Sequence, residues 1–279
     1  MAEKSFVAQY TYIDAAANAV SLFGIITNGL LLFAIFKDPL KCFRNSGTYF
    51  VINLSVSDCL TSLFAPVFDI EIYITAGTYS IFKIFVVWLG VASLLSLASI
   101  SVDRYLMVAY PFKHRILMKG KVILLWLTTV WVVSYVASVL TGFFGWRRDR
   151  NHVFTFCGII IILTAFIYAL TYHKLRQQSR SIALQTSIEA GAQMMRILKD
   201  TQFLKTIIII ACTAFVCVVP PMIFFQISDL LGFIGKDITS RKIFISIFYI
   251  NFAVNPLIYI LRLPKYRKTF YLVYCKRRS

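Results

Sequence analysis

Seven long apolar segments, each about as long as a membrane span, constrain this sequence more than any other feature. A helix needs about 20 mostly apolar residues to cross the hydrocarbon core of a bilayer. Only 15% of the residues are charged, against about 25% in an ordinary soluble domain. The sequence therefore predicts an all-α membrane protein, a seven-transmembrane helix bundle. We expect the spans near residues 15–36, 47–72, 82–110, 121–145, 153–175, 204–228 and 242–262.

The first apolar segment has no basic stretch ahead of it and is too long for the hydrophobic region of a signal peptide. We therefore interpret it as a permanent span. The expected organisation is an extracellular N-terminal tail over residues 1–14, the bundle over 15–262, and an amphipathic helix with a short cytoplasmic tail over 263–279.

Basic residues predict the orientation, because Lys and Arg concentrate in the cytoplasmic loops of membrane proteins. With the N-terminus outside, 21 of the 29 basic residues fall on the cytoplasmic side. The C-terminus is then cytoplasmic. The net charge of +17 forms a belt next to anionic membrane lipid, and nucleic acid is not an expected partner.

The six cysteines do not form a disulfide framework under this topology, because five of them lie in spans or on the inner side. Cys157 is expected near the outer surface, as a small apolar residue without a partner. Cys275, in the sequence "CKRRS", is a candidate for palmitoylation, with an ordinary reduced thiol as the alternative.

Two adjacent charges, Asp103 and Arg104, end a long segment that carries no charge from Ile84 to Ile100. They are expected at the cytoplasmic end of the third span. An adjacent opposite charge lowers the free-energy cost of a charge at that depth, so an ordinary ion pair at a helix end is one interpretation.

Polar side chains at membrane depth are a second unusual feature. Asp58 lies near the middle of the second span, Ser93 lies in the third, and Asn251 and Asn255 share one face of the seventh. A carboxylate surrounded by hydroxyl and amide oxygens suits a small hard cation or a proton. Hydrogen bonding between helices is the alternative for each residue.

Six short motifs occur in an order that resembles the rhodopsin-like (class A) G-protein-coupled receptors. The resemblance runs from Asn28 to Cys275, nearly the whole chain. The motifs are Asn28, "NLSVSDCL" in the second span, "DRY" at the end of the third, Trp131, Pro220 and "NPLIY" in the seventh.

The resemblance implies a cytoplasmic switch. Arg104 would alternate between an inactive partner, Asp200, and the C-terminal helix of a heterotrimeric G protein, while Tyr168 and Tyr259 would close on Arg104 in the active state. The residues implied in coupling are Asp103, Arg104, Tyr105, Phe112, Tyr168, Asp200, Asn255, Pro256 and Tyr259. The resemblance also implies a plasma-membrane location, with arrestin and a receptor kinase as further partners. Separately, the oxygen-rich cluster of Asp58, Ser93, Asn251 and Asn255 is a candidate sodium site.

The sequence departs from the usual family pattern at several positions. Tyr79 replaces the cysteine at the outer end of the third span, which leaves Cys157 without its usual partner. Val218 replaces the tryptophan of the sixth span, and Ile160 replaces the proline of the fifth. These departures favour the melanocortin, lipid, cannabinoid and adenosine branch.

The expected ligand is a peptide or a lipid. Val86 lies where amine receptors keep an acidic counter-ion, and Tyr249 lies where opsins attach retinal. Charges at the outer mouth are either a solvated rim or ligand contacts. The pocket candidates are Asp69, Glu71, Lys83, Val86, Val218 and Tyr249.

Two other protein classes were considered. A secondary transporter would use Asp58 as its midplane carboxylate, but the halves of the sequence show no internal repeat. An intramembrane enzyme would need a metal or an acid pair at depth, and the three histidines are far apart in sequence. We therefore expect no enzymatic activity and no cofactor beyond an allosteric sodium ion.

Overall fold

The computed structural model describes residues 2–74, 81–144, 151–183, 188–230 and 238–275. These residues are helical apart from short connections, and no strand occurs among them. The helices are α1 (Ala2–Lys37), α2 (Ser46–Ile74), α3 (Ile81–Ala109), α4 (Pro111–Leu117), α5 (Gly120–Phe144), α6 (Asn151–Ala183), α7 (Ile188–Leu230), α8 (Ile238–Arg262) and α9 (Pro264–Phe270), followed by a π-helical turn, Tyr271–Cys275.

Seven of these helices are long and apolar enough to cross a membrane, namely α1, α2, α3, α5, α6, α7 and α8. The predicted seven-helix bundle is therefore confirmed. Two helices are longer than their apolar segments, since α6 continues to Ala183 and α7 begins at Ile188. Polar residues that favour helix extend both beyond the apolar core. Helix α1 begins at Ala2, so the segment expected to be a separate tail is largely helical.

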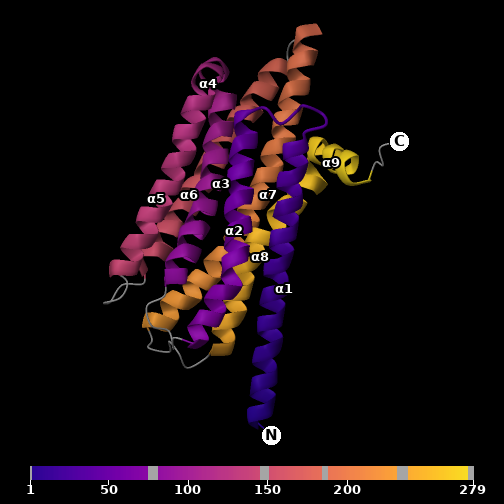
Figure 1. The fold of residues 1–279 in the computed structure, drawn as a ribbon. Helices are drawn as coiled ribbons and strands as arrows, with labels where there is room; N and C mark the ends of the chain where they lie inside the picture. Colours follow the sequence, from indigo (N-terminus) through magenta and orange to yellow (C-terminus); the bar gives the residue numbers. More distant parts are fainter. Residues whose placement is uncertain (1, 75–80, 145–150, 184–187, 231–237, 276–279) are drawn as a thin grey trace.

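Helix α3 is central in the bundle, where it packs against α2, α5 and α6 (Figure 1). Helix α1 packs against α2 and α8, and α7 packs between α6 and α8. The N-terminus lies at one end of the bundle, and α4 and α9 lie at the other (Figure 1). We call this second end the α4 end.

The connection between α1 and α2 is fixed by Asp38, which has a positive φ of 34°. Its carboxylate accepts hydrogen bonds from the backbone N–H groups of Cys42 at 2.8 Å and Phe43 at 3.3 Å. A short acidic side chain can satisfy neighbouring backbone groups in this way and tolerates the left-handed region. The turn buries Phe43 against the end of the bundle.

Large apolar side chains cover the outward faces of the helices. Leu124, Leu125 and Ile162 are each more than 65% exposed, and similar residues occur along α1, α6 and α7. A contiguous apolar surface of this size is a liability in water, whereas hydrocarbon solvates it. The exposed surface therefore agrees with a bilayer as the surrounding solvent.

Candidate functional site

The buried ion pair expected from "DRY" is present at the α4 end. Nη2 of Arg104 lies 2.9 Å from Oδ2 of Asp103, whose side chain is fully buried. The other carboxylate oxygen, Oδ1, lies 2.9 Å from Nε2 of His114 on α4. The hydroxyl of Ser46, the first residue of α2, lies 3.4 Å from the same histidine nitrogen. Asp103 therefore joins α3 to α4, and Ser46 connects the same histidine to the start of α2.

The guanidinium of Arg104 also packs on an aromatic ring. Its central carbon lies 4.3 Å from the ring centre of Phe203 on α7, which is within the range of a cation–π contact. Its Nη1 donates to the sulfur of Met107 at 3.4 Å. A methyl group at Gly47 of α2 would overlap Nη2 and would lie only 2.8 Å from Cζ of Arg104. Gly47 thus leaves the space that the guanidinium fills.

Asp200 is half-buried on α7 and within electrostatic range of Arg104. Among the described residues, however, no ion pair joins the two side chains, and Arg104 is held by Asp103 and Phe203 instead. The assignment of Asp200 as the inactive-state partner stays a prediction.

Two buried tyrosines face this region from α6 and α8. Tyr168 and Tyr259 are almost fully buried, and neither hydroxyl has a hydrogen-bond partner in the described part of the chain. The ring of Tyr259 stacks on that of Tyr266 at 5.4 Å. A buried hydroxyl without a partner is costly, so both groups would gain from a rearrangement that supplies one.

Lys265, at the start of α9, places a second cation near Arg104. Its Nζ lies 5.0 Å from the ring centre of Tyr266, 5.3 Å from that of Phe43 and 5.8 Å from that of Phe203. Burial, and secondarily the positive charge of Arg104, lower the pKa of Lys265 to about 8. The ring of Phe203 is therefore shared by two cations.

The remaining coupling candidates lie close by. Phe112 on α4 is 84% exposed, and its contact with a G protein stays a prediction. Tyr105 packs edge-on against Tyr110, with ring centres 6.4 Å apart. Pro256 lies inside α8, next to the buried Asn255. Cys275 is an exposed free thiol.

Asp58 lies at the centre of the second candidate site, in the middle of the bundle. Its two carboxylate oxygens accept hydrogen bonds from the hydroxyl of Ser93 at 2.5 Å and from the amide of Asn255 at 2.8 Å. Asn251 is buried, but its side chain makes no hydrogen bond to Asp58 among those described. The side-chain carbonyl oxygens of Asn251 and Asn255 are buried without partners. Such oxygens are ligands that hard cations prefer.

Other polar side chains at this depth link helices. The amide of Asn28 donates to the backbone oxygens of Gly24 and Phe252, at 2.9 and 2.8 Å, and so connects α1 to α8. Asn53 donates to Ser96 at 2.7 Å and accepts from the indole of Trp131 at 2.8 Å, joining α2, α3 and α5. For these residues, hydrogen bonding between helices accounts for the polar group.

The expected ligand pocket is only partly described. The side chains of Asp69, Glu71 and Lys83 lie outside the described residues, as does Tyr79. Val86, Val218 and Tyr249 are buried. Cys157 is a buried free cysteine that packs near Val218, as the prediction of an unpaired apolar residue requires. An ion pair between Asp14 and Lys242, at 2.6 Å, links α1 to α8 and was not predicted.

Three further residues of the α4 end were not predicted, namely Gly47, His114 and Phe203. In the sequence, His114 is one of three histidines that lie too far apart to indicate a metal site. Its position eleven residues after Asp103, with Pro111 between them, could have indicated that the chain turns back at this point. Nothing in the sequence distinguishes Gly47 or Phe203 from other residues of their kind.

Comparison with known proteins shows which family part of the chain resembles. Residues 27–160 match the family described as 7 transmembrane receptor (rhodopsin family). This part of the chain is therefore similar to the rhodopsin-like receptors. The family is one of receptors rather than enzymes, and the match agrees with the seven spans and with the motif order.

The chain is also similar to several proteins named adrenergic receptors. It is 24% identical to the alpha-1A adrenergic receptor of Oryzias latipes and 23% identical to that of Homo sapiens, in both cases over 89% of its length. It is 31% identical to that of Canis lupus familiaris over 50% of this chain and 51% of the relative. The chain spans 63% and 66% of the length of the first two relatives. These relatives do not support the predicted melanocortin, lipid and adenosine branch.

Proposed function

We propose that the chain is a rhodopsin-like receptor, which transmits the binding of an extracellular ligand to a heterotrimeric G protein that docks at the α4 end. The observation that carries this proposal is the position of Arg104, largely buried at the end of α3 and held by Asp103 and Phe203. A largely buried cation that pairs with the preceding residue and with one aromatic ring can exchange the contact with the ring for a contact with a partner protein. Such an exchange is a two-state switch.

The helix that would move is α7, because Phe203 is its contact with Arg104. When α7 moves away, Arg104 loses the ring and becomes accessible from the α4 end. The unpartnered hydroxyls of Tyr168 and Tyr259 then supply the polar contacts that would hold the released arrangement. We infer that the α4 end faces the cytoplasm and that the N-terminus lies outside the plasma membrane, and the distribution of basic residues supports this orientation. Arrestin and a receptor kinase would act on the same cytoplasmic face.

We further propose that sodium binds at Asp58. The carboxylate, Ser93, and the unpartnered carbonyl oxygens of Asn251 and Asn255 form a set of buried oxygens that suits a small hard cation. Sodium would stabilise whichever arrangement keeps these oxygens together. The residues on α2, α3 and α8 would then bind the ion, and its charge would compensate that of Asp58.

Two observations favour different classes of ligand. The relatives are named adrenergic and octopamine receptors, which favours an amine. Val86 is buried and aliphatic, which favours a ligand without a cation that must be neutralised on α3, such as a peptide or a lipid. Adrenaline, octopamine, peptide and lipid panels tested for G-protein activation would separate these classes. Activation by a simple amine at low micromolar concentration would overturn the peptide or lipid prediction.

The test of coupling is nucleotide exchange on G proteins in membranes that carry the receptor. Arg104→Ala should reach the cell surface but lose basal and ligand-stimulated exchange, because the partner loses its buried cation. Asp200→Ala should raise basal exchange if this carboxylate helps to hold the inactive state. Wild-type exchange by Arg104→Ala at equal surface expression would refute the proposed switch.

A further inference from the structure

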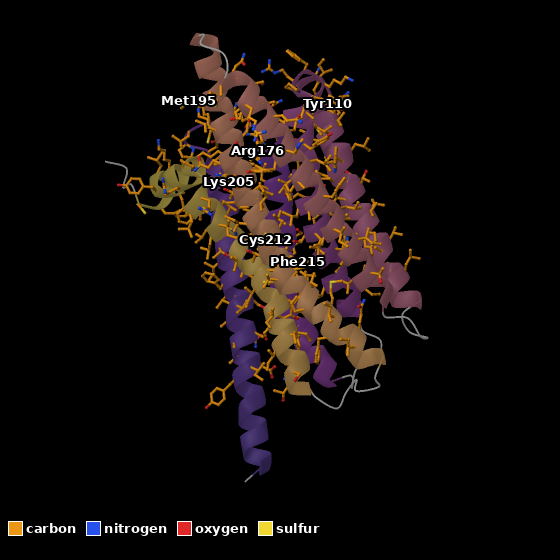
Figure 2. All side chains as sticks on the ribbon, turned by 180° about the vertical axis from the view of Figure 1, so that it is seen from behind. Tyr110, Arg176, Met195, Lys205, Cys212 and Phe215 are labelled. Carbon is orange, nitrogen blue, oxygen red and sulfur yellow. The ribbon has the colours of Figure 1, made fainter. Side chains whose placement is uncertain are left out.

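A lateral groove of about 410 Å³ opens between α3, α6 and α7. Its walls are almost entirely apolar, with Leu94 and Leu97 at its base on α3. Small side chains make room for it, because Ala165 and Ala169 are four residues apart on α6 and face Ala211 and Cys212 on α7. Figure 2 shows Cys212 and Phe215 of this wall from the side opposite to Figure 1.

The groove lies in the half of the membrane nearer the α4 end. On α7, no charged residue occurs between Lys205 and Asp229, a length that matches one membrane span. The α7 wall of the groove, Ile208 to Phe215, begins three residues after Lys205 and ends ten residues after it. At about 1.5 Å per residue, the wall covers depths of about 5 to 15 Å from Lys205. One leaflet contributes about 15 Å of hydrocarbon, so the groove matches the depth of a single leaflet.

Two cations lie where the groove meets the membrane interface. Arg176 follows Tyr172, a groove residue of α6, by four positions, and Lys205 precedes Ile208 by three, so each cation continues the groove face of its helix. Both side chains are exposed. Figure 2 shows both on the α4 side of Cys212 and Phe215. No ion pair involves either cation among the described residues, so both charges are available to an anion.

We propose that this groove binds an anionic phospholipid of the leaflet at the α4 end. One acyl chain occupies the apolar groove, and Arg176 and Lys205 bind the phosphate-bearing headgroup. Apolar walls at the depth of one leaflet select a hydrocarbon chain, and two cations at the interface select a negative headgroup. The groove shares Tyr168 with the Arg104 network, but lipid binding can be measured without a G protein, so its test is independent of coupling.

The first experiment measures binding directly, with the full chain in nanodiscs. Two photoactivatable lipids are compared, phosphatidylserine and phosphatidylcholine, each with a diazirine in the middle of one acyl chain. Cross-links are mapped by mass spectrometry of receptor peptides. Phosphatidylserine should label the α6 and α7 peptides that line the groove more strongly than phosphatidylcholine does, while the outer faces of α1 and α5 should show no such preference.

The charges are tested with Arg176→Ala and Lys205→Ala, singly and together. Each basic residue near a membrane surface strengthens anionic lipid binding by about fivefold, so the double variant should lose about 25-fold of the preference for phosphatidylserine. Lys119→Ala with Lys121→Ala is the matched control, because it removes two exposed cations near the start of α5, away from the groove. This control should keep the preference.

The apolar part is tested with Ala169→Phe, which fills the groove. Labelling by both lipids should fall at the groove peptides, whereas Leu163→Phe, on the exposed surface of α6, should leave it unchanged. If Ala169→Phe does not fold, Ala211→Phe is the alternative. The charge variants still test the preference for an anionic headgroup.

Three results would overturn the proposal. Equal labelling by the two lipids at the groove would show that the cations do not select a headgroup. Displacement of the label by cholesterol, with no effect of the charge variants, would show a neutral lipid site. Cross-links between two receptor copies at these peptides would show that the groove is an interface.

Discussion

Replacing Gly47 with alanine tests the packing that holds Arg104 in place. The added methyl group would overlap Nη2 of Arg104 and approach Cζ to 2.8 Å, so one of the two groups must move. The guanidinium is the end of a flexible side chain, whereas the α2 backbone is fixed by neighbouring helices. We therefore expect Gly47→Ala to displace the guanidinium from the ring of Phe203.

The expected magnitude follows from the contacts that are lost. The Arg104 side chain is only 12% exposed, so its cation–π contact with Phe203 falls near the desolvated end of the range, about 1 to 2 kcal/mol. A change of this size alters a two-state ratio by about 5- to 30-fold. If about 1% of receptors are active without ligand, the active fraction would rise to about 5 to 25%.

The assay is basal nucleotide exchange on G proteins, normalised to surface expression, together with thermal unfolding in detergent. Gly29→Ala is the matched control, because a methyl group at Gly29 of α1 meets no atom within 4 Å. Phe203→Leu removes the ring but keeps most of the apolar volume, so it should also raise basal exchange. In the double variant Gly47→Ala, Phe203→Leu, the rise in basal exchange should be clearly less than the sum of the two single effects. Both changes remove the same contact, the one between Arg104 and Phe203. Basal exchange of Gly47→Ala equal to that of Gly29→Ala would refute the reasoning.

Two further predictions concern the sodium site and Lys265. Asp58→Asn should abolish any difference in thermal stability between sodium and a bulky organic cation, and a difference that persists in the variant would leave only hydrogen bonding at this site. Because burial lowers the pKa of Lys265 to about 8, below its ordinary value near 10.5, the unfolded chain binds the additional proton between these pH values. The stability of the native receptor should therefore rise as the pH increases from about 8 to 10.5, and Lys265→Met should flatten this rise in thermal unfolding; an identical slope in both proteins would contradict it.

The sequence predicted the number of spans and their order because a span must be apolar over a fixed length. It did not predict the extensions of α6 and α7, since hydropathy measures membrane depth, while helix formation continues wherever the backbone favours it. The contact of Asp58 with Ser93 and Asn255 was predictable from their shared depth and polarity. Asn251 met the same criteria, but no hydrogen bond joins it to Asp58 among the described residues, because depth and helix face do not determine side-chain direction.

The contact between Arg104 and Phe203 shows a different limit. The chain contains 25 phenylalanines, most of them in helices where an aromatic side chain faces either lipid or core. Nothing in such a pattern selects the single ring that a guanidinium will cover. The family resemblance pointed to Asp200 through the spacing between "LKT" and Pro220, whereas it pointed to no aromatic residue. Which ring the guanidinium contacts depends on how the helices pack.

This arrangement also determines what the α4 end can offer a partner. Arg104 and Lys265 both lie over Phe203, and the carboxylate paired with Arg104 is fully buried beneath it. If α7 moves, Phe203 leaves both cations. In the described part of the chain, no other aromatic ring of α7 lies over either cation, and no ion pair joins either one to an acidic residue of α7. The C-terminus of a helix carries unsatisfied carbonyl groups and about half a negative charge. The released cations would therefore complement the C-terminal helix that we expect a G protein to insert. Removing either cation should weaken the contact with the G protein, whereas removing the ring of Phe203 should expose both cations even when no ligand is bound.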